Sequence, residues 1–379
     1  MHADVGVIGL GIMGSMAMWQ LAKRNISVIG FEQFGTGHDR SAAGGESRLF
    51  RTAYMEGLQY VPLLQEARVL WKQLEKETGT NLLTLNGGLM IGSPDLGAMR
   101  SVMQCIERYD LDHEYFEKSE AERRFPQHRL FTGEIMILDK NAGFLRPELA
   151  VVTTVQHAEH LGAKIFRYTK VEEISPDRDG VTIKTEEHTY RVGKVLVTAG
   201  PWTGMILPKL AKKIKARRLV LTWFTAKNIK QFESENFPIF ARMGKDFRLT
   251  GVPSLDRSMV KVSNTFMPNE MKHPDELDRN VTVEEISRVG RAVETYLPDL
   301  IPYPVRASVY MDAYTPDHHA VVGNIPGMKN VFLMSGFSGH GFKMSPVMGK
   351  IVTDLILGGK TEYSIDFLSV SRLVHSNKQ

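Results

Sequence analysis

The chain has 379 residues, of which 42% are hydrophobic and 24% are charged, and its formal net charge is +4 at pH 7. This length favours more than one structural core, and the composition is typical of a globular protein. The mild charge, the absence of a nucleic-acid-binding motif and the absence of an apolar run of roughly 18 residues argue against nucleic-acid and membrane partners.

The single cysteine, Cys105, excludes an internal disulfide framework and favours a reducing compartment. It lies in "AMRSVMQCIERY", whose apolar spacing predicts a helix with a buried thiol. No signal-peptide pattern precedes the first predicted strand, so we expect a cytosolic protein. We also expect a monomer.

The N-terminal segment predicts a βαβ unit. Residues 4–9, "DVGVIG", predict a buried strand, and the turn "GLGIMG" (9–14) leads into a helix that ends near Arg24 with Asn25 as its cap. "ISVIGFE" predicts a second buried strand that ends at Glu32. The glycines allow a pyrophosphate to approach the helix N-terminus, and Glu32 is spaced to bind a ribose hydroxyl. The unit predicts a dinucleotide site that fits NAD as well as FAD.

The next segments alternate between helices and strands. "YVPLLQEARVLWKQLEKETG" predicts an amphipathic helix with Pro62 in its first turn and Gly79 at its end. "GFLRPELAVVTTVQHAEHLGAKI" predicts a helix that leads into a strand, and "YTKVEEI", "GVTIKTEEHTYRV" and "KVLVTAG" each predict a strand. Ala199 and Gly200 close the last strand and allow a ligand to approach the carboxyl edge of a sheet.

The basic run "KLAKKIKARR" (209–218) predicts a solvated helix or loop, because no aromatic residues interleave it. Residues 217–305 predict a sheet-rich segment with one helix that begins at a capping box of Thr282 and Glu285. "KNVFLMSGFSGHGFKMSPVMGKIVTDLILGG" predicts a strand, a glycine-rich loop and a helix. His318 and His319 are expected on opposite faces of a strand, and without further ligand spacing we expect no metal site.

The order of the elements predicts an α/β fold with a Rossmann-type FAD-binding domain and an inserted, sheet-rich α+β substrate domain. The FAD-binding domain takes residues 1–80, 146–216 and 306–379, and the substrate domain takes residues 81–145 and 217–305. In an NAD-dependent hydroxyacid dehydrogenase the nucleotide domain is usually followed by a helical domain. Here the C-terminal third returns to strands and a second glycine-rich loop, which favours the larger FAD.

Four stretches resemble the flavin-dependent amine oxidases of the monomeric sarcosine oxidase and N-methyl-L-tryptophan oxidase family over nearly the full chain. They are "GGESRLFRTAYMEGLQYVPL" (44–63), "GFLRPELA" (143–150), "SVYMDAYTPDHHAVVG" (308–323) and "GFSGHGFKMSPVMGK" (336–350). The resemblance implies an FAD-dependent oxidase of N-alkyl α-amino acids. The imine product is hydrolysed to an amine or amino acid and an aldehyde, and O₂ is reduced to H₂O₂. The expected partners are therefore a small N-substituted amino acid and O₂.

The resemblance also implies roles for charged residues. Arg51 and Lys343 match the pair of cations that hold the substrate carboxylate, and such a pair can orient the carbon that is oxidised. Arg48 matches an arginine near the flavin ring, and Lys261 matches the lysine that stabilises negative charge on O₂. For His340, in the glycine-rich loop, contact with flavin or substrate and simple pairing with the backbone are both open.

The remaining cofactor contacts are expected along the same motifs. They are Gly9, Gly11, Ile12, Met13, Gly14, Glu32, Gln33, Ser41, Val171, Ala199, Gly200, Trp202, Met311, Gly339, Gly341 and Phe342, together with Arg48 and Lys343.

Some positions depart from the family pattern. Tyr310 stands where members commonly attach FAD through a cysteine, so we expect FAD to be bound without a covalent bond. Asp312 replaces a tyrosine that lines the substrate site, and Asn264 or Thr265 replaces a histidine that follows the lysine. An N-substituted amino acid is therefore expected, but not sarcosine in particular, and Asp312 could accept a substrate with an extra cation.

Several alternatives stay open from the sequence. Within flavoenzymes they are a fructosyl-amino-acid oxidase and a flavin amine dehydrogenase that uses another electron acceptor. Outside that group they are an NAD-dependent hydroxyacid dehydrogenase and a flavin-binding protein without catalysis.

Overall fold

The computed structural model describes residues 2–265 and 269–375, which form a mixed α/β protein. The first sheet contains β1 (His2–Ile8), β2 (Val28–Phe31), β9 (Lys164–Phe166), β10 (Val171–Pro176), β11 (Val181–Thr185), β12 (Thr189–Val197), β19 (Val321–Asn324) and β20 (Val331–Ser335). The second sheet contains β5 (Gly88–Gly92), β6 (His113–Phe116), β7 (Ile135–Asp139), β13 (Lys215–Phe224), β14 (Ile239–Met243), β15 (Arg248–Val252), β16 (Val260–Asn264), β17 (Asn269–Glu270) and β18 (Arg306–Tyr314). A small third sheet contains β3 (Arg48–Phe50), β4 (Leu83–Thr84) and β8 (Gly143–Leu145).

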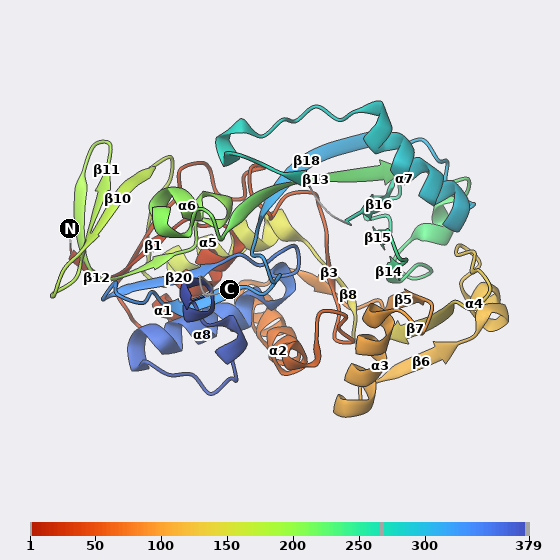
Figure 1. Ribbon diagram of the computed structural model, residues 1–379, viewed down its shortest axis with the longest axis horizontal. Helices are drawn as coiled ribbons and strands as arrows, with labels where there is room; N and C mark the ends of the chain where they lie inside the picture. The colour runs from red at the N-terminus through yellow and green to blue at the C-terminus, as the bar shows by residue number, and fades with distance from the viewer. Residues whose placement is uncertain (1, 266–268, 376–379) are drawn as a thin grey trace.

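The helices divide between the two large sheets, which lie toward opposite ends of the long axis of the molecule (Figure 1). They are α1 (Ile12–Lys23), α2 (Val61–Thr78), α3 (Gly97–Tyr109), α4 (Lys118–Arg124), α5 (Pro147–His160), α6 (Thr203–Ile206), α7 (Val283–Tyr296), α8 (Ser345–Gly358) and α9 (Ser371–His375). Helices α3, α4 and α7 lie at the end of the second sheet, whereas α1, α5 and α8 lie with the first.

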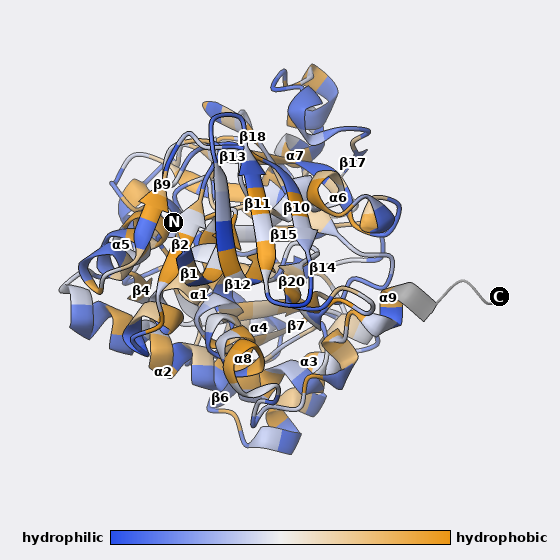
Figure 2. Ribbon diagram, turned by 90° about the vertical axis from the view of Figure 1, so that its left-hand side faces the viewer, coloured by the Kyte–Doolittle hydropathy of each residue, from blue (hydrophilic) through white to orange (hydrophobic). Residues whose placement is uncertain are grey.

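The centre of the first sheet is parallel and buried. Strand β1 pairs in parallel with β2 and β12, and β12 pairs in parallel with β20. Helix α1 contacts both α5 and α8, and its Met16 and Trp19 are fully buried beneath them. Figure 2 shows hydrophobic residues on α8 and along the strands, as expected for a parallel sheet with covered faces. Because parallel strands end at the same edge, the turns after β1, β2, β12 and β20 meet there.

The second sheet is mostly antiparallel and crosses over that edge. Its strand β18 pairs with β13 along their whole shared length, from Lys215 opposite Tyr314 to Trp223 opposite Arg306. The predicted domain boundary at residue 306 therefore falls at the first residue of a strand of the second sheet. The predicted division of the chain into two domains otherwise stays a prediction.

Several predicted elements are confirmed. Helix α2 has Pro62 in its first turn and ends at Gly79, whose φ is +67°. The capping box of Thr282 and Glu285 begins α7, and Cys105 is buried in α3.

Three local predictions are wrong. Residues 180–192 form no single strand: the chain turns after Thr185, and β12 then runs without a break from Thr189 to Val197. The basic run lies partly in β13, where Lys215 and Arg218 form ion pairs with Glu270 and Glu285. His318 and His319 lie in the loop between β18 and β19 rather than in a strand. In the first case the chain turns back on itself because β11 and β12 pair as a hairpin. In the second case the basic run joins a sheet through strands that are distant in the chain, β17 and β18.

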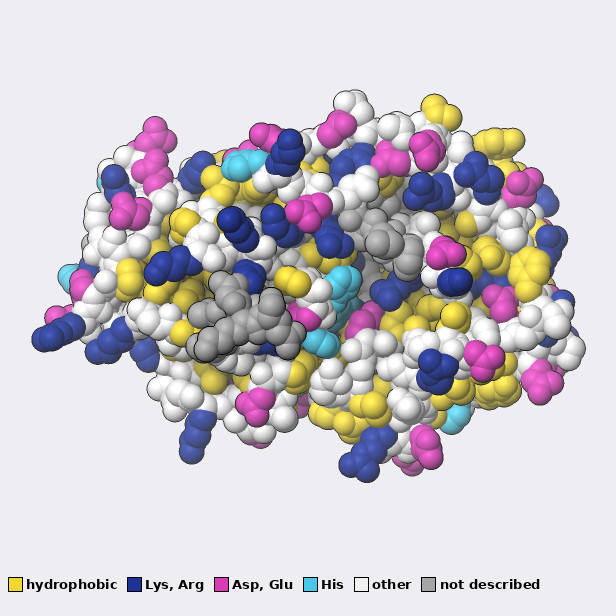
Figure 3. Space-filling view, in the orientation of Figure 1, with side chains coloured by type: hydrophobic (Ala, Val, Ile, Leu, Met, Phe, Trp, Pro, Cys, Tyr) yellow, Lys and Arg dark blue, Asp and Glu magenta, His cyan; other side chains and the backbone are white. Residues whose placement is uncertain are grey.

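On the face shown in Figure 3, acidic and basic side chains are intermixed, so no single sign of charge dominates it. Within residues 2–265 and 269–375, no helix has both the length and the apolar character needed to cross a membrane.

Candidate functional site

A cavity of about 510 Å³ lies between the carboxyl edge of the first sheet and one face of the second. It gathers residues from widely separated parts of the chain. The predicted site residues that line it are Gly9, Gly11, Ile12, Met13, Glu32, Gln33, Ser41, Arg48, Arg51, Val171, Ala199, Gly200, Trp202, Lys261, Asp312, Gly339, His340, Gly341, Phe342 and Lys343. Gly14 and Met311 do not line it.

The glycines of the "GLGIMG" turn have different local roles. Gly9 has a φ of +90°, which favours glycine. A Cβ atom at Gly14 would lie 2.0 Å from the carbonyl oxygen of Gly9, so this residue lets α1 pack closely against the turn. At Gly11 a Cβ atom would meet nothing within 4 Å, and this open space faces the cavity at the N-terminus of α1. A pyrophosphate requires such a space.

These roles predict different outcomes for two similar substitutions. Gly14→Ala should destabilise the fold by about 1–3 kcal/mol, because its methyl group would overlap the backbone of Gly9. Gly11→Ala should leave the unfolding transition near that of the wild type and yet weaken FAD binding. Urea unfolding of both apoproteins and FAD titration by fluorescence test this pair. Equal stability of the two variants would contradict the packing role of Gly14.

Glu32 follows β2 at the edge of the cavity and is 4% exposed. Its two carboxylate oxygens accept hydrogen bonds from the backbone N–H groups of Leu10 and Phe34, each at 2.9 Å. The carboxylate is therefore fixed beside the glycine turn, where its free lone pairs can accept ribose hydroxyls. Together, the open space at Gly11, the N-terminus of α1 and this carboxylate fit the pyrophosphate and ribose of FAD.

The second sheet presents one face to the cavity. Because successive side chains along a strand point to opposite faces of a sheet, about every second residue can reach the cavity. On β18, Tyr310, Asp312 and Tyr314 line the cavity, whereas the buried Met311 between them points away. On β16, Lys261 also faces inward. A lysine on an uncovered strand face would point to solvent, but the segment before β3 covers Lys261 and accepts its hydrogen bonds.

Lys261 is 8% exposed and is held by the segment before β3. Its Nζ donates to the carbonyl oxygens of Gly45 at 2.9 Å and Ser47 at 2.8 Å, and it lies 3.4 Å from Ser47 Oγ. Burial, and next the nearby charge of Arg48, lower the pKa of Lys261 well below its ordinary value. An anion that forms beside Nζ would oppose this effect and favour the ammonium form of Lys261, which would in turn stabilise the anion.

Arg48, the first residue of β3, is fixed by backbone carbonyl groups. Its guanidinium donates to Ser47 O at 2.8 Å and to Ala42 O at 2.6 Å. Burial lowers the pKa of Arg48, while the carboxylates of Glu148 and Asp312 oppose this effect. Arg48 therefore adds a fixed positive charge to the wall of the cavity.

Arg51 lies deeper, beside an acidic residue that the sequence analysis missed. Its guanidinium lies 3.4 Å from Glu56 Oε1, and Arg248 approaches the same oxygen to 3.5 Å. Although burial alone would raise the pKa of Glu56, Arg51 and further nearby cations lower it to about 2. Glu56 stands in the quoted motif "RTAYMEG", but the sequence gives no sign that its side chain points inward.

Lys343 follows the glycine-rich loop and faces the cavity near Arg51. Its Nζ donates to His340 O at 2.8 Å and to Tyr54 Oη at 3.3 Å. The side chains of Lys343 and Arg51 both lie against the ring of Tyr54, at 5.2 Å and 5.4 Å from its centroid. Burial, and next the charge of Arg51, lower the pKa of Lys343 to about 7.

This pKa predicts a pH dependence of anion binding. In the free protein Lys343 loses its proton as the pH rises through about 7, whereas a bound carboxylate favours the ammonium form. Binding of butyrate should therefore weaken by up to about tenfold per pH unit above that point. Calorimetric titrations from pH 6 to pH 9 measure this, and Lys343→Met should remove the dependence. A wild-type affinity that stays constant over that range would contradict it.

Both ring nitrogens of His340 have partners. Nδ1 lies 2.9 Å from Tyr54 Oη, and Nε2 lies 2.9 Å from His318 O. Burial lowers the pKa of His340 to about 4, so the ring is neutral at pH 7. Neutral His340 therefore bridges Tyr54 and the loop before β19, and pairing of its ring with the backbone is the arrangement observed.

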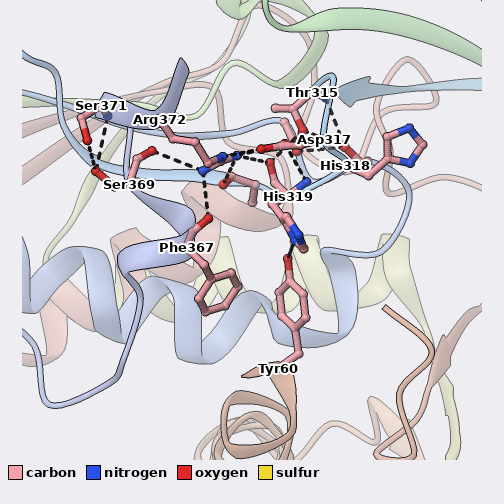
Figure 4. A network of polar contacts seen from close by, with 12 residues as sticks. Tyr60, Thr315, Asp317, His318, His319, Phe367, Ser369, Ser371 and Arg372 are labelled. Carbon is pink, nitrogen blue, oxygen red and sulfur yellow. Dashed lines mark hydrogen bonds and ion pairs between the residues drawn. The ribbon is translucent and has the colours of Figure 1, made fainter. Parts of the chain in front are cut away.

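A polar network behind His340 fixes that loop (Figure 4). Arg372 on α9 donates to Asp317 Oδ2 at 2.5 Å and to His319 O at 2.7 Å. His319 Nδ1 lies 2.7 Å from Tyr60 Oη. The C-terminal segment thereby holds the loop whose carbonyl group contacts His340.

Tyr310 and Asp312 occupy the two family positions that differ. The ring of Tyr310 packs on Gly44, where a Cβ atom would lie 1.9 Å from Tyr310 Cε1. Asp312 Oδ1 accepts from Ala313 N at 2.7 Å, and Oδ2 accepts from Gly339 N at 2.9 Å. Burial raises the pKa of Asp312 to about 6, against the effect of these hydrogen bonds.

Comparisons with known proteins agree with this geometry. The family model described as FAD dependent oxidoreductase (DAO) matches residues 4–355. A monomeric sarcosine oxidase from Streptomyces avermitilis is 35% identical over 98% of this chain and 97% of its own length. An N-methyl-L-tryptophan oxidase from Salmonella dublin is 27% identical over 98% of this chain and 99% of its own.

The fold also matches the solved open form of NikD, described as an unusual amino acid oxidase essential for nikkomycin biosynthesis. The TM-score is 0.84 at 23% identity, with 97% of each chain covered. The predicted α/β fold class, with an FAD-binding sheet and a separate sheet-rich part, is confirmed. The family match supports FAD rather than NAD as the cofactor. The chain therefore belongs to the FAD dependent oxidoreductase (DAO) family, and within it to the sarcosine oxidase-like amine oxidases that act on CH–NH donors.

Proposed function

We propose that the protein is an oxidase of N-alkyl α-amino acids, with N-methyl amino acids as the simplest substrates. FAD, when bound, takes an electron pair from the substrate carbon beside the amine and delivers it to O₂. The products are then H₂O₂ and an imine, which water hydrolyses to an amine or amino acid and an aldehyde.

The observation that carries the proposal is that two cations, Arg51 and Lys343, lie beside the same tyrosine ring. Both cations line the cavity that contains the glycine turn, and both lie against the ring of Tyr54. A guanidinium fork and an ammonium group can bind one carboxylate and fix the adjacent carbon and nitrogen. Lys261 and Arg48, on other walls of the cavity, supply fixed positive charge for the reaction with O₂. The position of Lys261 favours the oxidase over the dehydrogenase alternative.

A substrate panel tests the function. The purified holoprotein is assayed for H₂O₂ with N-methyl amino acids of differing side chains, with fructosyl amino acids, and with the parent primary amino acids. Turnover of the N-methyl series supports the proposal. Turnover of fructosyl amino acids alone would favour that alternative, and flavin reduction without H₂O₂ formation would favour a dehydrogenase. The expected monomeric state and cytosolic location stay predictions.

We also propose that FAD is held without a covalent bond. Tyr310 supplies no sulfur, and Cys105 lies buried in α3 and does not line the cavity. Burial raises the pKa of Tyr310, which disfavours a nucleophilic phenolate. Acid precipitation should therefore release yellow FAD, near one equivalent, into the supernatant. Flavin that stays on the washed, denatured polypeptide would contradict this.

A further inference from the structure

A third cation lies beside the pair of Arg51 and Lys343. Arg248 is the first residue of β15, and it shares the cavity-facing side of this strand with Thr250, while Leu249 is buried on the opposite side. Its side chain is 40% exposed, and its guanidinium lies 3.5 Å from Glu56 Oε1. Since Arg51 approaches the same oxygen to 3.4 Å, two guanidinium groups flank one carboxylate.

The charges around this point do not balance. Arg51, Arg248 and Lys343 all lower the pKa of Glu56, which is therefore a shared counter-ion for three cations. Asp312, a carboxylate on another strand that lines the same cavity, interacts more with Arg48 than with Lys343, because Arg48 lowers the pKa of Asp312 more than Lys343 does. A substrate α-carboxylate bound by Arg51 and Lys343 supplies one further negative charge. One positive charge, on Arg248, then still lacks a full partner among these groups.

The guanidinium of Arg248 is also able to bind a further anionic group. Within residues 2–265 and 269–375 it forms an ion pair with Glu56, at a separation too long for a strong hydrogen bond. A guanidinium carries five N–H donors, and this one is partly open to solvent. Thr250 and Thr265 add hydroxyl groups to the same wall of the cavity. This wall suits a short polar or acidic side chain better than a large apolar one.

We propose that Arg248 binds a second acidic group of the substrate, so that the enzyme prefers N-alkyl derivatives of dicarboxylic amino acids such as glutamate and aspartate. This inference rests on the proposed function, because it places the α-carboxylate on Arg51 and Lys343. The side-chain carboxylate then meets Arg248, which is close enough to Arg51 to share a carboxylate oxygen with it.

The first experiment compares two substrates of nearly equal size. For the wild-type holoenzyme, kcat/KM for N-methyl-L-glutamate should exceed that for N-methyl-L-glutamine by about tenfold or more, the effect of one charge-assisted contact. Arg248→Leu should bring this ratio close to one, and Arg248→Lys should keep part of it. Because the readout is a ratio, a general loss of activity cancels. The control Arg257→Leu changes an arginine that is 78% exposed and does not line the cavity, and it should keep the ratio.

A binding measurement separates this inference from the proposed function. By calorimetry, glutarate should bind the wild-type holoenzyme about tenfold or more tightly than butyrate, and Arg248→Leu should remove that difference. If no N-methyl amino acid reduces the bound flavin but glutarate keeps its Arg248-dependent advantage, the proposed function fails and the dicarboxylate site stands. The inference is overturned if wild type treats the glutamate and glutamine derivatives alike, or if Arg248→Leu keeps either preference.

Discussion

Replacing Lys261 by Met is expected to slow the reaction of the reduced enzyme with O₂ by about 10²–10³-fold, the usual cost of removing a fixed stabilising group from a developing anion. The ammonium group is held in place by Gly45 O and Ser47 O, so it needs no rearrangement before it acts. It lies on the second sheet and is neither of the two cations, Arg51 and Lys343, that contact the ring of Tyr54. Anaerobic reduction of the flavin by substrate should therefore stay near the wild-type rate.

Stopped-flow spectroscopy separates the two half-reactions. The substituted enzyme is first mixed with substrate without oxygen, and the reduced enzyme is then mixed with buffer that contains O₂. Unchanged reoxidation would remove Lys261 from the reaction with O₂ and favour a dehydrogenase. A large loss in the anaerobic step alone would place Lys261 in substrate oxidation instead.

Replacing Arg51 by Met is expected to lower kcat/KM for carboxylate substrates by about 10- to 100-fold, which corresponds to roughly 1.5–3 kcal/mol for a charge-assisted contact. Lys343→Met should give a loss of similar size. Neither substitution changes the glycine turn or Glu32, which are expected to hold the pyrophosphate and ribose of FAD. FAD should therefore stay bound in both variants.

The matched measurement uses one N-methyl amino acid and its decarboxylated amine. Wild type should strongly prefer the amino acid, and each variant should lose most of that preference. If both variants keep the wild-type kcat/KM for the amino acid, the carboxylate clamp is wrongly assigned.

The sequence predicts an element well where its signals are local. The turn "GLGIMG", the acidic residue after the second strand and the capping box at Thr282 each depend on residues close together in the chain. The predicted positions of Gly9, Gly11 and Glu32 on the cavity follow from that local pattern.

The contacts of the second sheet could not be predicted in the same way. Lys261, Met311 and Arg248 lie on strands, and only the partner that covers a strand decides which face is inside. Met311 was grouped with the cofactor contacts, yet alternation along β18 points it away from the cavity while Asp312 faces it. Arg248 was missed because its approach to Glu56 joins segments that are far apart in the chain. Glu56 lies close to Arg51 in the chain, but no local pattern shows that its side chain points into the cavity.

The most direct test of the proposed function is an anaerobic titration of the yellow holoenzyme with an N-methyl amino acid. We expect the oxidised flavin absorbance to be lost with one equivalent of substrate per flavin, and admission of O₂ to restore it with release of one equivalent of H₂O₂. An intact holoenzyme whose flavin stays oxidised in the presence of every N-alkyl amino acid, whether its side chain is acidic or neutral, would contradict the account.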